Sequence, residues 1–173
     1  MSNYEFLLNK KNFESFSNAC IEAEKSILVS PSTCATITRR ALELAVKWLY
    51  ANDSELRIPY QENLSSLIHN NSFVELIDYK MLHMLKYIVK LVNVSVHTNQ
   101  IIDREEAILA LHNLHQFVSW IDYCYSDEYH EVEFDESLLL YGEEKRTRPE
   151  ELKDLYDRLS SKDKKLEEMI KEN

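Results

Sequence analysis

Glycine is almost absent from this chain of 173 residues, which contains only Gly142. A phosphate-binding P-loop and a dinucleotide-binding fingerprint each need several glycines, because the backbone must approach phosphate groups closely. Tight β-hairpin turns also depend on glycine where φ is positive, so a fold built from hairpins is disfavoured. The shortage of glycine therefore excludes these two nucleotide-binding motifs and favours an all-α fold.

Cysteine and long apolar runs are scarce as well. The three cysteines, Cys20, Cys34 and Cys124, are odd in number and none belongs to a Cys-x-x-Cys pair. This usage argues against a disulfide framework or a zinc finger and is typical of a reducing cytoplasm. No apolar run reaches the ~18 residues of a membrane span, and the N-terminus lacks the apolar core of a signal peptide. We therefore expect a cytoplasmic protein with no membrane partner.

Positive charge is in the minority, with 20 Lys and Arg against 30 Asp and Glu and a net charge of −10. An acidic surface repels phosphates, so the composition argues against a protein that wraps nucleic acid over its whole surface. A local basic patch stays open. The length and the 45% of hydrophobic residues suffice for one domain with a real core and an appendage.

Apolar residues recur at helical spacing through most of the first 126 residues. The pattern predicts helices over 13–28, 32–50, 62–69, 72–77, 80–96 and 103–125. Two starts carry capping signals: Ser30 precedes Pro31 at a first helical position, and Asp103 precedes Glu106 at capping-box spacing. We predict an all-α, antiparallel helical bundle over residues 1–126.

Beyond residue 126 the composition changes. Asp127–Glu136 holds six acidic residues and no Lys or Arg, which predicts a solvated acidic linker over 127–148. From Pro149 onward, leucines at heptad positions predict an amphipathic C-terminal extension helix over 149–173. The chain stops without a capping signal, so we expect this helix to lead into downstream domains that are absent from the sequence.

One candidate binding group lies on the helix predicted over 32–50. Arg39 and Glu43 are four residues apart, and Arg40 and Glu43 are three apart. At these spacings the side chains form ion pairs on a helix surface. The alternative is that an arginine of this group reaches a phosphate or a partner chain.

A second candidate group shares one face of the helix predicted over 80–96. Lys90, Asn93 and His97 follow one another at intervals of three and four residues. A cation, an amide and an imidazole on one face are able to bind a phosphate or polarise a 2′-hydroxyl. The alternative is a polar helix end whose histidine caps neighbouring carbonyls.

Two further patterns imitate metal sites. His112 and His115 stand three residues apart on one predicted helix, which brings two imidazoles toward one metal. Asp135 followed by Glu143-Glu144-Lys145 imitates the Asp…Glu-x-Lys pattern of Mg²⁺-dependent nucleases. The first lacks further ligands at a recognised spacing, and the second lacks the hairpin that such a centre needs. We expect no metal site, no cofactor and no catalytic residue in this chain.

Several segments follow an order and spacing that are specific when taken together. Residues 39–50 read Arg-Arg-Ala-Leu-Glu-Leu-Ala-Val-Lys-Trp-Leu-Tyr, residues 63–69 read Asn-Leu-Ser-Ser-Leu-Ile-His, and residues 134–139 read Phe-Asp-Glu-Ser-Leu-Leu. Over about residues 5–140 the chain resembles the small helical domain at the N-terminus of type I restriction enzyme R (restriction) subunits. That domain is assigned to the HEPN-like helical superfamily, so the resemblance implies a HEPN-like bundle.

The resemblance also implies what this chain does. A type I R subunit is an ATP-dependent translocase and Mg²⁺-dependent endonuclease, and both activities lie C-terminal to this module. ATP and Mg²⁺ are therefore implied for the parent enzyme alone. The implied partners are the remaining domains of the R subunit, the methyltransferase and specificity subunits, and DNA through the complex. The implied role is docking within this DNA restriction assembly.

Two departures from the family pattern bear on catalysis. The pattern near His97 places an arginine and a glycine where this chain has Val89 and Val92. HEPN-type ribonucleases pair that arginine with the histidine, so the resemblance implies a catalytically silent module. One alternative is a stand-alone HEPN-like ribonuclease or toxin-type protein, with Lys90 replacing the arginine. Another is a helical protein-interaction module that pairs through the helix at 149–173.

Overall fold

The computed structural model describes residues 1–141 and, beyond them, residues 157, 164 and 168. All regular structure in residues 1–141 is helical, and no strand occurs there. The long helices are α1 (Glu14–Lys25), α2 (Pro31–Asn52), α5 (Tyr79–Thr98) and α6 (Arg104–Tyr125). The short ones are α3 (Leu64–His69), α4 (Asn71–Leu76) and α7 (Ser137–Tyr141). The prediction of an all-α fold is confirmed.

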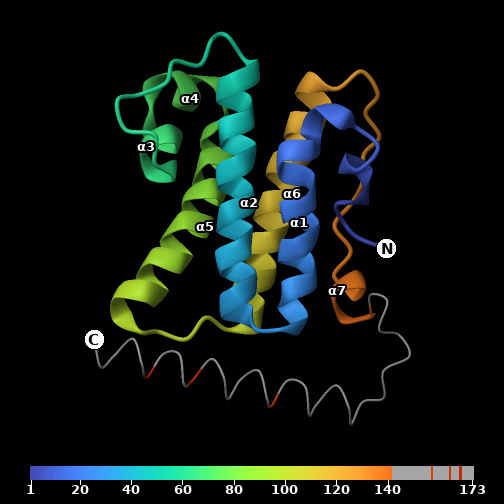
Figure 1. The fold of residues 1–173 in the computed structure, drawn as a ribbon, viewed down its shortest axis with the longest axis vertical. Helices are drawn as coiled ribbons and strands as arrows, with labels where there is room; N and C mark the ends of the chain where they lie inside the picture. The colour runs from blue at the N-terminus through green and yellow to red at the C-terminus, as the bar shows by residue number, and fades with distance from the viewer. Residues whose placement is uncertain (142–156, 158–163, 165–167, 169–173) are drawn as a thin grey trace.

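The long helices form an antiparallel bundle (Figure 1). Helices α1 and α5 run in one direction, while α2 and α6 run in the other. Helix α2 packs against α1, α5 and α6, and α5 also packs against α6. Toward its C-terminal end α5 diverges from α2, as Figure 1 shows. None of the described helices combines the length and the apolar character needed to cross a membrane.

Local capping signals set the starts of the helices. The Ser30 side chain accepts a hydrogen bond from the Thr33 amide at 3.0 Å, and Pro31 occupies the first turn of α2. At the start of α6, Asp103 and Glu106 form both hydrogen bonds of a capping box, 2.8 and 3.1 Å long. These bonds satisfy amide groups that a helix leaves unpaired at its N-terminus. Both helices begin within a residue of the predicted position.

The bundle core includes an aromatic cluster where α1, α2 and α6 meet. Phe13, Phe16 and Tyr125 each place a ring edge-on to Trp48, with centroids 5.2 to 5.9 Å apart. The indole of Trp48 donates a hydrogen bond to the Asn12 carbonyl oxygen at 2.6 Å. Phe13 and Phe16 are buried, and each contributes about 1.5–3 kcal/mol through its apolar surface, whereas Trp48 and Tyr125 are half-buried.

The segment that follows α6 returns along the bundle (Figure 1). The Asp135 amide donates to Asn3 Oδ1 at 2.6 Å, and Asn3 Nδ2 donates to the Asp135 carbonyl oxygen at 3.0 Å. Phe134 packs against the core, and Leu139 in α7 is 2% exposed. The predicted boundary at residue 126 and the predicted linker are therefore wrong for residues 127–141. The acidic side chains are solvated as expected, but the main chain and two apolar side chains dock on the bundle.

The remainder of the predicted linker, 142–148, lies outside the described residues. The predicted C-terminal helix over 149–173 also lies outside them, apart from residues 157, 164 and 168. The heptad pairing expected of that helix therefore stays a prediction.

The first ten residues hold the returning segment in place, and we call residues 3–10 the N-terminal clasp. Asn3 donates two hydrogen bonds to the buried Glu24 carboxylate, one from its main-chain amide at 3.0 Å and one from its side-chain Nδ2 at 2.8 Å. Tyr4 donates to the Leu111 carbonyl oxygen at 2.6 Å. The Lys10 ammonium pairs with Asp122, whose side chain is 1% exposed, and donates to the Glu128 carbonyl oxygen at 2.7 Å. The clasp thus links α1, α6 and the segment after α6.

Candidate functional site

The first predicted candidate group lies on the outer side of α2. The core side of this helix is lined by small and apolar side chains such as Ala41, Leu42 and Ala45. Arg40 is exposed, and Arg39 and Glu43 are half-buried beside the core stripe. Their placement follows from the helix period, because residues three and four apart share a face.

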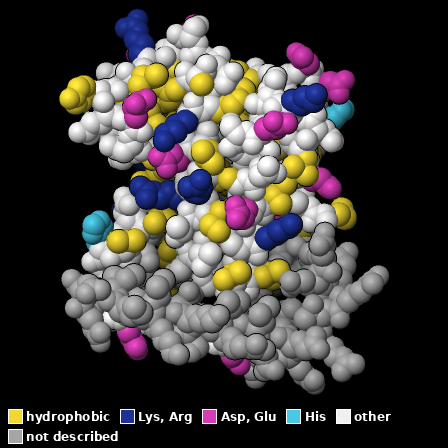
Figure 2. All heavy atoms as spheres, viewed as in Figure 1, with side chains coloured by type: hydrophobic (Ala, Val, Ile, Leu, Met, Phe, Trp, Pro, Cys, Tyr) yellow, Lys and Arg dark blue, Asp and Glu magenta, His cyan; other side chains and the backbone are white. Residues whose placement is uncertain are grey.

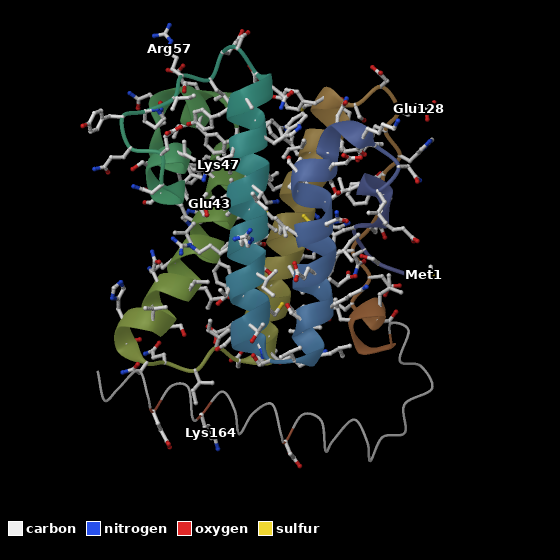
Figure 3. The ribbon with its side chains drawn as sticks, in the orientation of Figure 1. Met1, Glu43, Lys47, Arg57, Glu128 and Lys164 are labelled. Carbon is white, nitrogen blue, oxygen red and sulfur yellow. The ribbon has the colours of Figure 1, made fainter. Side chains whose placement is uncertain are left out.

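The ion pairing in this group differs from the prediction. Glu43 pairs with Lys47, one turn further along α2, with Nζ and Oε1 3.3 Å apart. Figure 3 shows both side chains on the flank of α2 that faces α3 and α5. Neither arginine forms a salt bridge within the described residues, so the predicted Arg39–Glu43 and Arg40–Glu43 pairs are wrong. The buried Nε of Arg39 likewise has no hydrogen-bond partner among them.

The second candidate group lies on α5, where Lys90, Asn93 and His97 are all exposed. Three more donors continue the same face toward the start of the helix, and sequence reasoning missed them. We call the six residues the donor ladder: Tyr79, His83, Lys86, Lys90, Asn93 and His97. Successive members are separated by four or three residues, which places all six on one side of a helix. That spacing was the sequence signal that could have found them.

The start of the ladder is a stacked pair of rings. Tyr79 and His83 lie with their centroids 5.5 Å apart and an interplanar angle of 24°. Both side chains are exposed. The opposite side of α5 carries Leu82, Leu85 and Ile88 into the core. The helix is therefore divided into an apolar side and a side that presents the six hydrogen-bond donors of the ladder.

Helices α2 and α5 concentrate positive charge in an acidic chain. Helix α5 contains three Lys, two His and no Asp or Glu. Helix α2 contains two Arg, one Lys and a single carboxylate, Glu43. The two helices pack against each other, and Figure 2 shows Lys and Arg side chains gathered over their boundary at the middle left of the view. We call the donor ladder together with Arg39, Arg40 and Lys47 the α2–α5 basic surface.

Comparison with known proteins places the chain in a family. A family model described as "Domain of unknown function (DUF4145)" matches residues 21–169. The chain belongs to the DUF4145 family. No curated protein and no solved structure matches it. The stretch matched by the DUF4145 model includes all of α2 and α5, and therefore the whole basic surface, whereas the N-terminal clasp precedes it.

The two departures from the expected pattern near His97, at positions 89 and 92, lie on the core side of α5 in this DUF4145 domain. Val89 and Val92 are each 6% exposed and belong to the bundle core. His97 is exposed near the end of the same helix. The two valines contribute apolar packing on one side, and the histidine is presented on another.

The two histidines of the predicted pair, His112 and His115, differ in how deeply they are buried. His115 is 1% exposed, its ring packs edge-on to Tyr4, Phe6 and Phe134, and neither nitrogen has a hydrogen-bond partner among the described residues. Burial lowers the pKa of His115 to about 4, and neighbouring His112 acts in the same direction. The main chain of Asn3 has a smaller opposing effect. His115 is therefore a neutral core side chain at pH 7.

Of the residues in the nuclease-like pattern, only Asp135 lies in the part of the chain that the structure describes. Its carboxylate accepts hydrogen bonds from the Ser137 hydroxyl at 2.6 Å and the Ser137 amide at 3.0 Å. These bonds lower the pKa of Asp135, and the bond from the Ser137 hydroxyl has the larger effect. They also hold the carboxylate at the start of α7. Glu143, Glu144 and Lys145 lie outside the described residues. Within the described part of the chain, no three His, Cys, Asp or Glu side chains are grouped to hold a metal ion.

Proposed function

We propose that this chain is a non-catalytic module of a type I restriction enzyme R subunit. Its role is to dock against the remaining domains of that subunit, or against the methyltransferase and specificity subunits and their DNA. The observation that carries the proposal is the run from Arg39 to Tyr50, whose twelve residues follow the family pattern and lie within the single helix α2. The run presents its apolar side to the core and its charged residues to the surface, where they are accessible to a partner.

The departures at residues 89 and 92 support the non-catalytic part of the proposal. A HEPN-type ribonuclease needs a cation beside the histidine to stabilise charge on the scissile phosphate. The side chain at position 89 is a buried valine, which carries no charge and packs in the core. In this proposal the ATP-dependent translocation and the Mg²⁺-dependent DNA cleavage belong to other domains of the parent enzyme.

The first test is the reading frame of the native gene beyond the codon for Asn173. We expect it to continue into a nuclease segment with an Asp…Glu-x-Lys pattern and then into a P-loop translocase. A stop codon directly after Asn173 would overturn the assignment to an R subunit. The full R subunit encoded by that gene should then require this module for assembly with the methyltransferase–specificity complex, as measured by analytical ultracentrifugation.

The second test concerns activity. The purified chain, incubated with Mg²⁺ and ATP, should neither cleave DNA nor hydrolyse ATP. Metal-independent RNA cleavage that disappears in His97→Ala would refute the non-catalytic assignment and establish the ribonuclease alternative. An equal low activity in the parent chain and in His97→Ala would identify a contaminant and leave the proposal standing.

A further inference from the structure

The donor ladder extends along the length of α5. From Tyr79 to His97 it covers 19 residues, whose 18 steps correspond to about 27 Å of helix. Each turn contributes a side chain able to donate a hydrogen bond: a phenol, an imidazole, two ammonium groups, an amide and a second imidazole. No carboxylate interrupts α5. A surface that offers donors at every turn and no carboxylate suits a ligand with acceptors and negative charge at regular intervals.

Helix α2 adds cations beside this ladder. Arg40 is exposed, and Lys47 stands two turns further along the same helix. The single carboxylate of α2, Glu43, is already paired with Lys47. Glu43 offsets the charge of Lys47, so four other cations dominate the charge of the surface: Arg39, Arg40, Lys86 and Lys90.

Six of the acidic residues lie away from this surface, whereas Glu43 and Asp78, the N-cap of α5, border it. The segment 127–136, with six carboxylates, runs along the side of the bundle beside α1 and the N-terminal clasp, and α5 lies on the other side (Figure 1). This separation of charge attracts a polyanion to one side of the molecule and repels it from the other. The net charge of −10 limits the strength of binding, and the uneven distribution of the charge favours one orientation.

We propose that the α2–α5 basic surface binds the phosphodiester backbone of duplex DNA. Lys, Arg, Asn and Tyr are side chains that proteins use to contact phosphates, and such contacts position a protein without reading sequence. Proteins that bind single strands stack bases on several exposed aromatic rings. Here the one phenol of the ladder is already stacked on His83, which favours a duplex. The choice of DNA over RNA rests on the proposed function.

The number of cations sets the expected affinity. Four phosphate contacts give a slope of log K against log salt of about −3.6, so binding weakens about 50-fold between 50 and 150 mM salt. At 150 mM salt the dissociation constant should lie near about 10⁻⁴ M, at the weak end of non-specific DNA binding, because the rest of the chain is acidic.

The experiment measures binding of the 173-residue chain to a fluorescein-labelled DNA duplex by anisotropy over a series of salt concentrations. The test variant is Arg40→Glu/Lys90→Glu, at two exposed positions of the surface. The matched control is Lys11→Glu/Lys25→Glu, which changes the net charge equally at two exposed positions outside the surface. Circular dichroism checks that both variants remain folded.

The proposal predicts that the test variant binds at least about 10-fold more weakly than the control and that its salt slope falls to about −2. Equal weakening in both variants, or no binding at about 100 µM protein in 50 mM salt, would overturn it. Tighter binding to single-stranded DNA, duplex RNA or polyglutamate than to the duplex would also overturn it and identify that ligand class. Assembly of the full R subunit with its methyltransferase complex is measured separately, so loss of DNA binding alone leaves the proposed function intact.

Discussion

Acidification should destabilise this protein through one buried side chain, His115. Its ring is enclosed by Tyr4, Phe6 and Phe134, and neither nitrogen has a hydrogen-bond partner among the described residues. In the folded protein burial lowers the pKa of His115 to about 4, whereas the unfolded chain has the ordinary value of 6.5. At pH values between about 4 and 6.5 the unfolded chain is protonated at this imidazole and the folded protein is not, so the free energy of unfolding decreases as the pH decreases.

The size of this effect follows from the two pKa values. Each pKa unit corresponds to about 1.36 kcal/mol, so the full loss of stability from His115 is about 3 kcal/mol at pH values below 4. The stabilisation is fully present above pH 6.5 and disappears as the pH falls toward 4. At pH 5 the loss from this residue is about 2 kcal/mol. Such a loss is a large part of the 5–15 kcal/mol that is typical of single domains.

Urea unfolding monitored by far-UV circular dichroism at pH 7.5 and pH 5 measures this loss. The variant His115→Leu removes the titrating group and leaves no new polar atom unpaired, so it should be as stable as the parent at pH 7.5. Its loss of stability between pH 7.5 and pH 5 should be smaller than that of the parent by about 2 kcal/mol. His69→Gln, at an exposed position, is the control. If His115→Leu and the parent lose stability equally, the reasoning is refuted.

Two further variants test the ends of the bundle. Lys10→Met leaves the Asp122 carboxylate buried without its cation and should lower the free energy of unfolding by about 3–5 kcal/mol, measured by urea denaturation. Adding Asp122→Asn should recover most of that loss, and no recovery would argue against the ion pair. Asp103→Ala removes the capping box of α6 and should cost about 1 kcal/mol, seen as a lower Tm, whereas Asp103→Asn should retain most of the stability. Equal Tm values for the two would contradict the role of the cap.

The long helices could be predicted from the sequence because the signals that mark their starts are local. A serine before Pro31 and a glutamate three residues after Asp103 mark the starts of α2 and α6, and the structure forms the expected hydrogen bonds there. The β-branched residues Val92, Val94 and Val96 stay helical because earlier leucines anchor α5 in the core. The helix ends only at Asn99, whose φ of 56° is left-handed. Asparagine tolerates that conformation better than most residues.

The errors arose where the deciding contacts are distant in sequence. Six carboxylates made residues 127–136 resemble a linker, and their side chains are indeed exposed. The segment docks through the main chain of Asp135 and through Phe134, and the bonds from Asn3 span 132 residues. No local sequence pattern indicates a hydrogen bond between residues so far apart in the chain. The burial of His115 could not be predicted for the same reason, because the N-terminal clasp supplies two of the rings that bury it.

The candidate site was predicted in part. Arg39, Arg40, Glu43, Lys90, Asn93 and His97 were chosen as two separate groups, and the structure places them on two helices that pack together. Their joining into one basic surface depends on the packing of α2 against α5, which no periodicity within either helix reveals. The choice of Lys47 over an arginine as the partner of Glu43 also depends on side-chain placement, since several i, i+3 and i, i+4 pairs were available.

The N-terminal clasp has a consequence for the order in which the protein is built. Tyr4, Lys10 and Asn3 leave the ribosome well before their partners Leu111, Asp122 and Asp135, which follow 107, 112 and 132 residues later. At typical rates of synthesis this interval is on the order of 10 s. During that time α1 and α2 are already able to pair as neighbours in sequence, while the first ten residues are left without their final contacts. The N-terminal clasp is therefore synthesised before the rest of the bundle but is among the last segments to form its final contacts.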